Sequence, residues 1–256
     1  MKYRNILGSV FVSVLVVGAN PVKAADGPVA KRVEFKPTLS IGGTWKVAVE
    51  KMSEAPDIPK ERLADWKPTK STVVFQFTVE MLEDIDIESC YRIRIESKTL
   101  NGKPYTIPVP YFRIYLRQAG LTLKKVERLN AKTDLVQASR LFEAGPVDAT
   151  DWVSDLPLAV PSFQEGQFDQ EPPVRRRKDG SAMAKPSGHC LQKEEIVRFG
   201  LAGKETDALR ITLDKKGDDV FPGHTTQTWV KGEPWWTEAT YDRDGRQGRS
   251  ARLLKE

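Results

Sequence analysis

The feature that most constrains the fold of this chain is an alternation of apolar and polar residues with a period of two. In the stretch 90–97, Tyr91, Ile93 and Ile95 alternate with arginine and glutamate residues. Such a pattern predicts a β-strand with one face in the core and one in solvent, because successive side chains of a strand point to opposite faces. The same alternation occurs in the segments 42–50, 71–80, 111–118 and 208–214.

Short connections between further strands predict an antiparallel sheet. Three more strand segments follow one another near the carboxyl end, and turn residues separate them. They are 225–230, 235–241 and 250–254. The segment 120–129 is expected to pair back onto 111–118 through a turn at Gln118–Gly120, with a bulge or strand end at Lys124-Lys125. The predicted fold class is mainly β: an antiparallel open barrel, half-barrel or sandwich with a carboxyl-terminal meander.

Only two segments have helical character. Lys60–Trp66 lies between Pro59 and Pro68, and these prolines limit it to one or two turns. Thr133–Gly145 is predicted to form a short helix, although its apolar residues would also suit an extended segment. One or two short helices are therefore expected beside the sheet.

The predicted domain organisation is simple. Residues 39–256 form a single β-rich domain, which includes an irregular, proline-rich segment at about 145–190, and residues 25–38 form a flexible leader. The run Arg175–Lys178 in the irregular segment is basic, but no aromatic residues flank it. A solvated loop is therefore favoured over a contact with nucleic acid.

The first 24 residues are predicted to be a cleaved signal peptide. Lys2 and Arg4 precede an uncharged, mostly apolar run from Ile6 to Ala19, and Val22-Lys23-Ala24 supplies small or medium side chains where a signal peptidase reads the chain. A membrane anchor is the alternative, but the run is shorter than the ~20 residues that a transmembrane helix needs. The mature protein is expected to start at Ala25 and to be soluble, in the periplasm or outside the cell.

The charge of the chain gives no reason to expect a nucleic-acid partner. The whole sequence has a formal charge of +5, but the predicted signal peptide holds three of the cations and no acid, which leaves +2 on the mature protein. A near-neutral protein lacks the extended basic surface that nucleic acids require.

Cys90 and Cys190 are the only cysteines, and both lie in the predicted exported part. In an oxidising compartment the simplest prediction is a disulfide between them. It would close a loop of about 100 residues and contribute ~4–5 kcal/mol in the chain-entropy model. A thiol nucleophile or a metal site with His189 is less favoured, because a metal needs at least three converging ligands and the chain has only two histidines.

Motifs for catalysis and metal binding are scarce. The sequence contains no G-x-S-x-G elbow, no H-E-x-x-H pair and no glycine-rich phosphate loop. In the stretch Ser187–Cys190 the hydroxyl, imidazole and thiol are adjacent in sequence, but adjacent side chains of an extended chain point apart. Two acidic groups resemble parts of calcium sites without the remaining ligands. They are Asp84, Asp86 and Glu88, and Asp242, Asp244 and Gly245. No cofactor or metal is expected.

The densest aromatic cluster begins at Trp229 and holds three of the six tryptophans. If Lys231–Pro234 is a four-residue hairpin loop, Trp229 faces Trp236 across the ladder. The opposite face, which carries Ala239 and Tyr241, is more apolar and is expected to be the core side. The tryptophan pair would then be either buried packing beneath another segment or an exposed platform.

Trp229 and Trp236, bordered by Arg252 of the last strand, are therefore the candidate ligand-binding residues. Two classes of function remain. We favour an exported, non-catalytic binding or envelope-associated protein, whose partner is an apolar, acyl or aromatic small ligand or another envelope protein. The alternative is an exported hydrolase with catalytic residues scattered over the strands. A concave apolar pocket would favour binding, and a histidine–acid pair in a cleft would favour an enzyme.

Overall fold

The computed structural model describes only part of the chain. The described residues are 34–52, 67, 69–141, 147–148, 159–160, 169–170, 189–201, 203–216, 223–243 and 246–255. All regular structure in these ranges is β-strand, and every strand pair is antiparallel. The main sheet has thirteen strands and is open, with β10 (Asp169–Gln170) at one edge and β7 (Val136–Leu141) at the other. The predicted fold class, mainly β with an open antiparallel sheet, is confirmed.

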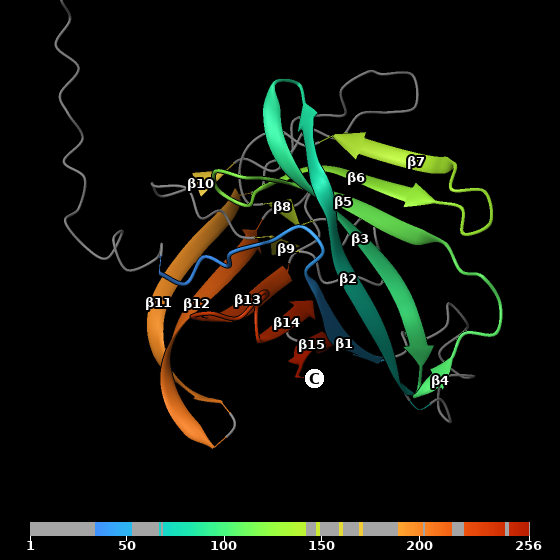
Figure 1. Ribbon diagram of the computed structural model, residues 1–256. Coiled ribbons are helices and arrows are strands. Elements are labelled where there is room, and N and C mark those ends of the chain that lie inside the picture. Colours follow the sequence, from blue (N-terminus) through green and yellow to red (C-terminus); the bar gives the residue numbers. More distant parts are fainter. Residues whose placement is uncertain are drawn as a thin grey trace, which may run out of the picture.

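The strands fall into an amino-terminal and a carboxyl-terminal group. The first group consists of β1 (Thr44–Met52), β2 (Lys70–Ile85), β3 (Glu88–Leu100), β4 (Lys103–Pro104), β5 (Tyr111–Arg117), β6 (Leu123–Leu129) and β7 (Val136–Leu141). The second consists of β11 (His189–Leu201), β12 (Lys204–Lys216), β13 (Gly223–Val230), β14 (Glu238–Arg243) and β15 (Arg246–Leu254). In Figure 1 the teal and green strands of the first group face the orange and red strands of the second across a strongly curled sheet.

The two groups are joined in the middle of the sheet by β1. This strand pairs with β2 on one side and with β15 on the other, where the register runs from Lys46 opposite Leu254 to Lys51 opposite Arg249. The meander β11–β15 and the strands β1–β7 therefore form one continuous sheet.

The core fills the inside of the curl. Most residues predicted to point inward are buried and belong to one cluster, because each alternating stripe faces the same side of the sheet, and Val73, Tyr91 and Phe112 are partly buried and pack against it. The buried residues include Trp45, Val47, Val49, Phe75, Phe77, Val79, Ile93, Ile95, Ile114, Leu116, Leu209 and Ile211. Trp45 and Phe77 are direct cross-strand partners, with ring centroids 5.3 Å apart.

The predicted helix at Thr133–Gly145 is wrong. Its described part contains strand β7, which pairs with β6 at the edge of the sheet. Most of β7 is exposed, so its side chains carry no clear inward stripe, and the free edge of β6 decides its conformation instead. The other predicted helix, Lys60–Trp66, lies outside the described residues.

The predicted bulge at Lys124-Lys125 is confirmed. Tyr115 pairs with Lys125 and Leu116 pairs with Leu123, so Lys124 is the extra residue in β6. The bulge lets the apolar residues on both sides of it, Leu123 and Val126, face the core.

The described chain begins with a segment that packs against the core. Phe35 and Leu39 are buried in the core cluster. Lys36 Nζ donates hydrogen bonds to the backbone carbonyls of Gln118 and Ala119, at 3.0 and 2.6 Å. The end of the predicted leader, residues 34–38, is thus part of the fold. The predicted signal peptide and residues 25–33 lie outside the described residues.

Few residues of the predicted irregular segment are described. Two short strands, β8 (Val147–Asp148) and β9 (Ala159–Val160), pair with each other, and β10 (Asp169–Gln170) pairs with the start of β11. The basic run Arg175–Lys178 lies outside the described residues.

Candidate functional site

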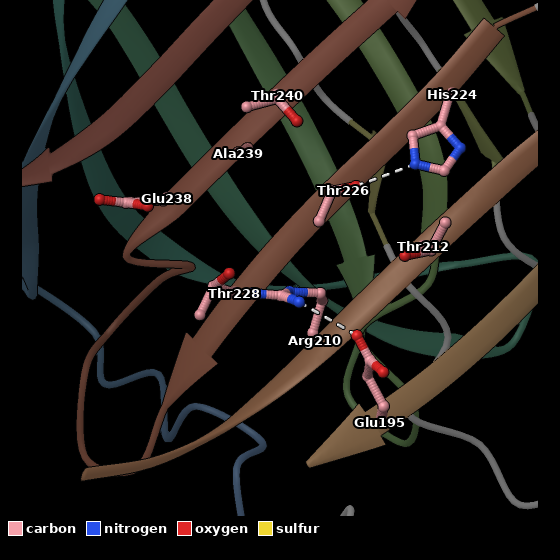
Figure 2. Close-up of a pocket in the computed structure, with 9 residues that line it drawn as sticks. All are labelled: Glu195, Arg210, Thr212, His224, Thr226, Thr228, Glu238, Ala239 and Thr240. Carbon is pink, nitrogen blue, oxygen red and sulfur yellow. Dashed lines mark hydrogen bonds and ion pairs between the residues drawn. The ribbon is translucent and has the colours of Figure 1, made fainter. Parts of the chain in front are cut away.

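A polar groove of about 440 Å³ lies on the face of β11–β14 that points away from the core (Figure 2). Ala239 is the one apolar residue in its lining, and the other residues carry hydroxyl, carboxylate, guanidinium or imidazole groups. We call it the outer groove. It is lined by Glu195, Arg210, Thr212, His224, Thr226, Thr228, Glu238, Ala239 and Thr240.

The register of the sheet sets the hydroxyl groups of the outer groove side by side. Thr226 of β13 lies opposite Thr212 of β12 and opposite Thr240 of β14. Directly opposed residues of antiparallel strands have Cβ atoms about 4.5–5.5 Å apart, so the three side chains form a row across the groove. We call it the threonine row.

A second row carries the charges of the groove. Thr228 lies between Arg210 and Glu238, and Arg252 of β15 extends this row beyond Glu238. Arg210 Nη1 contacts Glu195 Oε1 of β11 at 3.1 Å. Each cation of this row therefore has a carboxylate next to it, and the groove has no surplus of positive charge.

His224 is held between an acid and a hydroxyl. Its Nδ1 lies 2.5 Å from Asp214 Oδ1, on the residue directly opposite in β12. Its Nε2 lies 3.3 Å from Thr226 Oγ1, two residues along the same strand face (Figure 2). Because an ionised carboxylate only accepts, Nδ1 must carry the hydrogen, and Nε2 of the neutral ring is then an acceptor for the threonine hydroxyl.

The accessibility of this triplet differs along its length. The His224 side chain is 47% exposed and that of Asp214 only 20%. The neighbouring Asp242 of β14 lies opposite His224 on its other side. The imidazole is therefore flanked by carboxylates on two strands and opens toward the groove.

The predicted aromatic platform is not on the surface. Trp229 and Trp236 are 2% and 1% exposed, and both belong to the core cluster. They surround Trp235, at ring-centroid distances of 5.7 and 6.3 Å, and Trp235 in turn stacks on Trp45 at 5.4 Å. The candidate ligand surface formed by Trp229 and Trp236 is thus corrected to core packing.

A shift of register by one residue explains this correction. Gln227 lies opposite Ala239 rather than Glu238, because β14 begins only at Glu238 and the connection from β13 is longer than the expected four residues. A shift of one residue moves a side chain to the other face of the sheet. Trp229 therefore joins Ala239 and Tyr241 on the core face, as was predicted for the latter two.

Arg252, the third candidate residue, is exposed on the outward face of β15. It does not border the tryptophans. Its position opposite Glu238 places it at the end of the charged row of the outer groove.

The predicted disulfide is not formed in the structure. Cys90 is a free, fully buried thiol on β3, and its Sγ contacts the backbone oxygen of Glu88 at 3.5 Å. Cys190 lies on β11, and six strands separate β11 from β3 in the sheet order. Burial raises the pKa of the Cys90 thiol, which disfavours the reactive thiolate.

The acidic groups that resembled calcium sites are used otherwise. Lys124 Nζ contacts Glu88 Oε2 at 2.7 Å and Asp86 Oδ2 at 3.3 Å, and Arg117 Nε contacts Glu88 Oε1 at 2.9 Å. The hydrogen bonds from Lys124 and Arg117 lower the pKa of Glu88. Asp244 and Gly245 lie outside the described residues. Among those described, no group of three or more histidine, cysteine or carboxylate side chains is arranged to hold a metal ion.

A second set of charges covers the outward face of β2, β3 and β5. Glu80 Oε2 lies 2.8 Å from Arg92 Nε and 3.2 Å from Arg113 Nε. On β6, Glu127 accepts a hydrogen bond from the Tyr115 hydroxyl at 2.8 Å, and burial together with this bond raises the pKa of Tyr115. These groups are paired with one another, so they stabilise the sheet and leave the outer groove as the candidate site.

No sequence pattern marks the Asp214–His224–Thr226 triplet. The three residues belong to no motif, and the side chain of His189, which drew attention instead, lies outside the described residues. Only the register between β12 and β13 brings Asp214 to His224. The only sequence signal for this contact was that β12 and β13 follow each other and pair. Their register depends on the loop between them, which the period-two pattern does not define.

Comparison with known protein families, with curated proteins and with solved structures found no match for this chain. The described ranges also contain no helix long and apolar enough to cross a membrane. The inference of function therefore depends on the outer groove.

Proposed function

We propose that the protein is an exported binding protein whose outer groove takes a neutral, polyhydroxylated ligand such as a segment of a glycan. The single observation that carries this proposal is the threonine row, Thr212, Thr226 and Thr240, set side by side in a polar groove. Export is supported by the basic start and apolar run of the first 24 residues.

The chemistry of the lining supports a ligand rich in hydroxyl groups. Threonine hydroxyls both donate and accept, the Arg210 guanidinium only donates, and the Glu195 and Glu238 carboxylates only accept. Together they match the mixed donors and acceptors of a sugar. Because Arg210 is already paired with Glu195, an anionic ligand gains little from it.

The same lining argues against the apolar, acyl or aromatic ligand that the sequence suggested. The large aromatic residues of the nearby strands are in the core, and so is the side chain of Ala239. The apolar atoms left in the groove are those of its polar residues, such as the threonine methyl groups. Without an aromatic ring for a sugar face to stack on, the affinity should be low. We expect a dissociation constant on the order of 0.1–1 mM, about −4 to −5.5 kcal/mol.

The proposal is tested by two-dimensional amide NMR of the mature protein during titration with maltotetraose and with chitotetraose. An oligogalacturonide and dihexanoylphosphatidylcholine serve as an anionic and an acyl comparator. We expect shifts confined to β12–β14 with a neutral oligosaccharide. Thr240→Val should weaken that binding by about fivefold, the effect of one hydrogen bond of about 1 kcal/mol.

Thr72→Val is the matched control, because Thr72 lies on the outward face of β2, outside the groove. It should leave binding unchanged. Shifts caused only by the phospholipid, or no shifts with either neutral oligosaccharide at 20-fold the expected dissociation constant, would contradict the proposal.

A further inference from the structure

The triplet Asp214–His224–Thr226 has the connectivity of a nucleophile, a base and an orienting acid. Both contacts of the imidazole are in place: Nδ1 to Asp214 Oδ1 at 2.5 Å and Nε2 to Thr226 Oγ1 at 3.3 Å. The sheet fixes both, because Asp214 is the cross-strand neighbour of His224 and Thr226 is the next residue on the same strand face. An imidazole oriented in this way can take the proton of the hydroxyl.

We propose that Thr226 is an acylatable nucleophile and that the outer groove hydrolyses carboxylic esters carried by a polyhydroxylated ligand. This rests on the proposed function for the class of molecule that carries the ester, but the reaction itself uses atoms that binding does not require. It assigns Thr226 and His224 as catalytic residues and Asp214 as a positioning residue.

The reaction is a double displacement. Thr226 Oγ1 attacks the ester carbonyl carbon and passes its proton to His224 Nε2, and the C–O bond to the alcohol breaks as His224 returns that proton to the departing oxygen. Water then attacks the acyl–Thr226 ester and gives a proton to His224. Thr226 leaves with this proton, and the carboxylic acid is released. Asp214 stabilises the imidazolium that forms in each step.

The neighbours of Thr226 supply donors for the charge that develops on the carbonyl oxygen. Thr212 and Thr240 flank Thr226 on the two adjacent strands. The backbone N–H groups around Thr226 are engaged in the ladder, so the threonine hydroxyls take the role that backbone amides have in many acyl-transfer enzymes. We assign Thr212, on the strand that also holds Asp214, as the principal donor.

The position of His224 and Thr226 in the lining of the outer groove separates this arrangement from ordinary bracing of a sheet surface. The groove is open at His224 and Thr226, both of which line it, so an ester can reach the hydroxyl without movement of a strand. Bracing would need only the contact between His224 and Asp214. The contact of the Thr226 hydroxyl with Nε2, on the groove side, is the one that activation of a nucleophile requires and bracing does not.

The test is covalent trapping in the full-length mature protein. Incubation with a fluorophosphonate, and separately with p-nitrophenyl acetate, should place one adduct on the peptide that contains Thr226, as read by mass spectrometry. Thr226→Val should abolish the adduct and Thr226→Ser should retain it. His224→Gln should lower its rate of formation by about 100-fold or more, and Thr72→Val should leave it unchanged.

Adduct position, rather than release of p-nitrophenol, is the decisive readout, because an exposed imidazole hydrolyses that ester by itself. An adduct on another residue, the absence of any adduct, or equal labelling in Thr226→Val would overturn the proposal. So would labelling that survives His224→Gln at the original rate. Thr212→Val should slow labelling while the thermal unfolding temperature stays within a few degrees of the parent.

The failure of this proposal and the failure of the binding role give different results. Oligosaccharide shifts without any Thr226 adduct would leave a binding protein and remove the reaction. A Thr226 adduct that depends on His224, without oligosaccharide shifts, would keep the nucleophile and show that the ester is carried by another class of molecule.

Discussion

At the scale of single residues, the tryptophan cluster contains both satisfied and unsatisfied polar groups. Within the described residues, the indole N–H groups of Trp45, Trp235 and Trp236 are buried without a hydrogen-bond partner. Trp229 Nε1 instead donates to Gln227 Oε1 at 3.2 Å. Gln227 is itself 1% exposed, so this one hydrogen bond connects two buried side chains on the same strand face.

This pair gives a double-mutant prediction. Trp229→Phe should destabilise the protein through lost packing and, in addition, through the stranded Gln227 oxygen, which costs about 1–3 kcal/mol. Gln227→Leu in the Trp229→Phe background should recover part of that loss, whereas Gln227→Leu alone should destabilise. The measurement is the free energy of unfolding in urea for the four proteins of the cycle. Additive effects would show that the bond contributes nothing.

At the scale of elements, the β2–β3 hairpin shows an unusual turn. Its two-residue loop, Asp86-Ile87, has φ angles of 48° and 65°, which is the backbone of a type I′ turn. Asparagine and glycine favour this conformation, and a β-branched residue is a clear outlier in it. Ile87 is also 102% exposed, so its side chain gains nothing from burial.

Replacement of Ile87 by glycine should therefore stabilise the protein. The left-handed conformation costs an ordinary L-residue about 1–2 kcal/mol, part of which the greater freedom of glycine in the unfolded chain offsets, so a gain of about 1 kcal/mol is expected. The readout is the midpoint of thermal unfolding. Ile41→Gly is the matched control, because Ile41 is an exposed isoleucine outside the left-handed region and should gain nothing. A lower unfolding midpoint in Ile87→Gly would contradict the idea that the left-handed backbone at Ile87 is strained.

Elements also show how far the sequence could predict the structure. β1, β2, β3, β5 and β12 follow from alternation because one face of each is buried in the same core. β7 and β11 do not. β7 is exposed along most of its length. The pairing of β12 with β13 ends at Ala208, whereas β11 and β12 pair on to Leu201 and Lys204, so the end of this hairpin extends past β13. A strand without a buried face does not need alternating apolar and polar residues, so its sequence carries no period-two pattern.

The location of the candidate site depends on the register between neighbouring strands, which the alternation within one strand does not define. One residue of slip between β13 and β14 decides whether Trp229 lies in solvent or in the core. The same kind of information, between β12 and β13, decides whether Asp214 meets His224. The pattern within single strands therefore points to the aromatic residues but not to the polar groove, because the groove is assembled only by the register between neighbouring strands.

At the scale of the whole molecule, the two groups of strands share one core. Trp45 and Phe77 come from the first group and Trp235 from the connection between β13 and β14, and their rings lie 5.3–5.5 Å apart. The β1–β15 ladder runs across the same boundary. Neither group can therefore lose its packing without exposing the aromatic residues of the other.

We accordingly expect unfolding in a single cooperative transition. Tryptophan fluorescence, which reports on the shared cluster, and far-ultraviolet circular dichroism, which reports on all strands, should give the same midpoint in urea. Ala251 pairs with Val49 in the β1–β15 ladder, so Ala251→Asp places a charge on the core face of β15 and should lower both midpoints together. Two separated midpoints would divide the chain into independently folding halves.

The seam between β1 and β15 also affects the order of events during folding. Lys46 pairs with Leu254, so the ladder in the middle of the sheet closes a loop that includes nearly all of the described strands. Hairpins such as β2–β3 and β11–β12 are local and can form early, but contacts of such high sequence separation must meet the entropy of loop closure first. The central ladder is then among the last parts to form. Until β15 has been inserted between β14 and β1, the edges of these two strands are open to pairing with other chains.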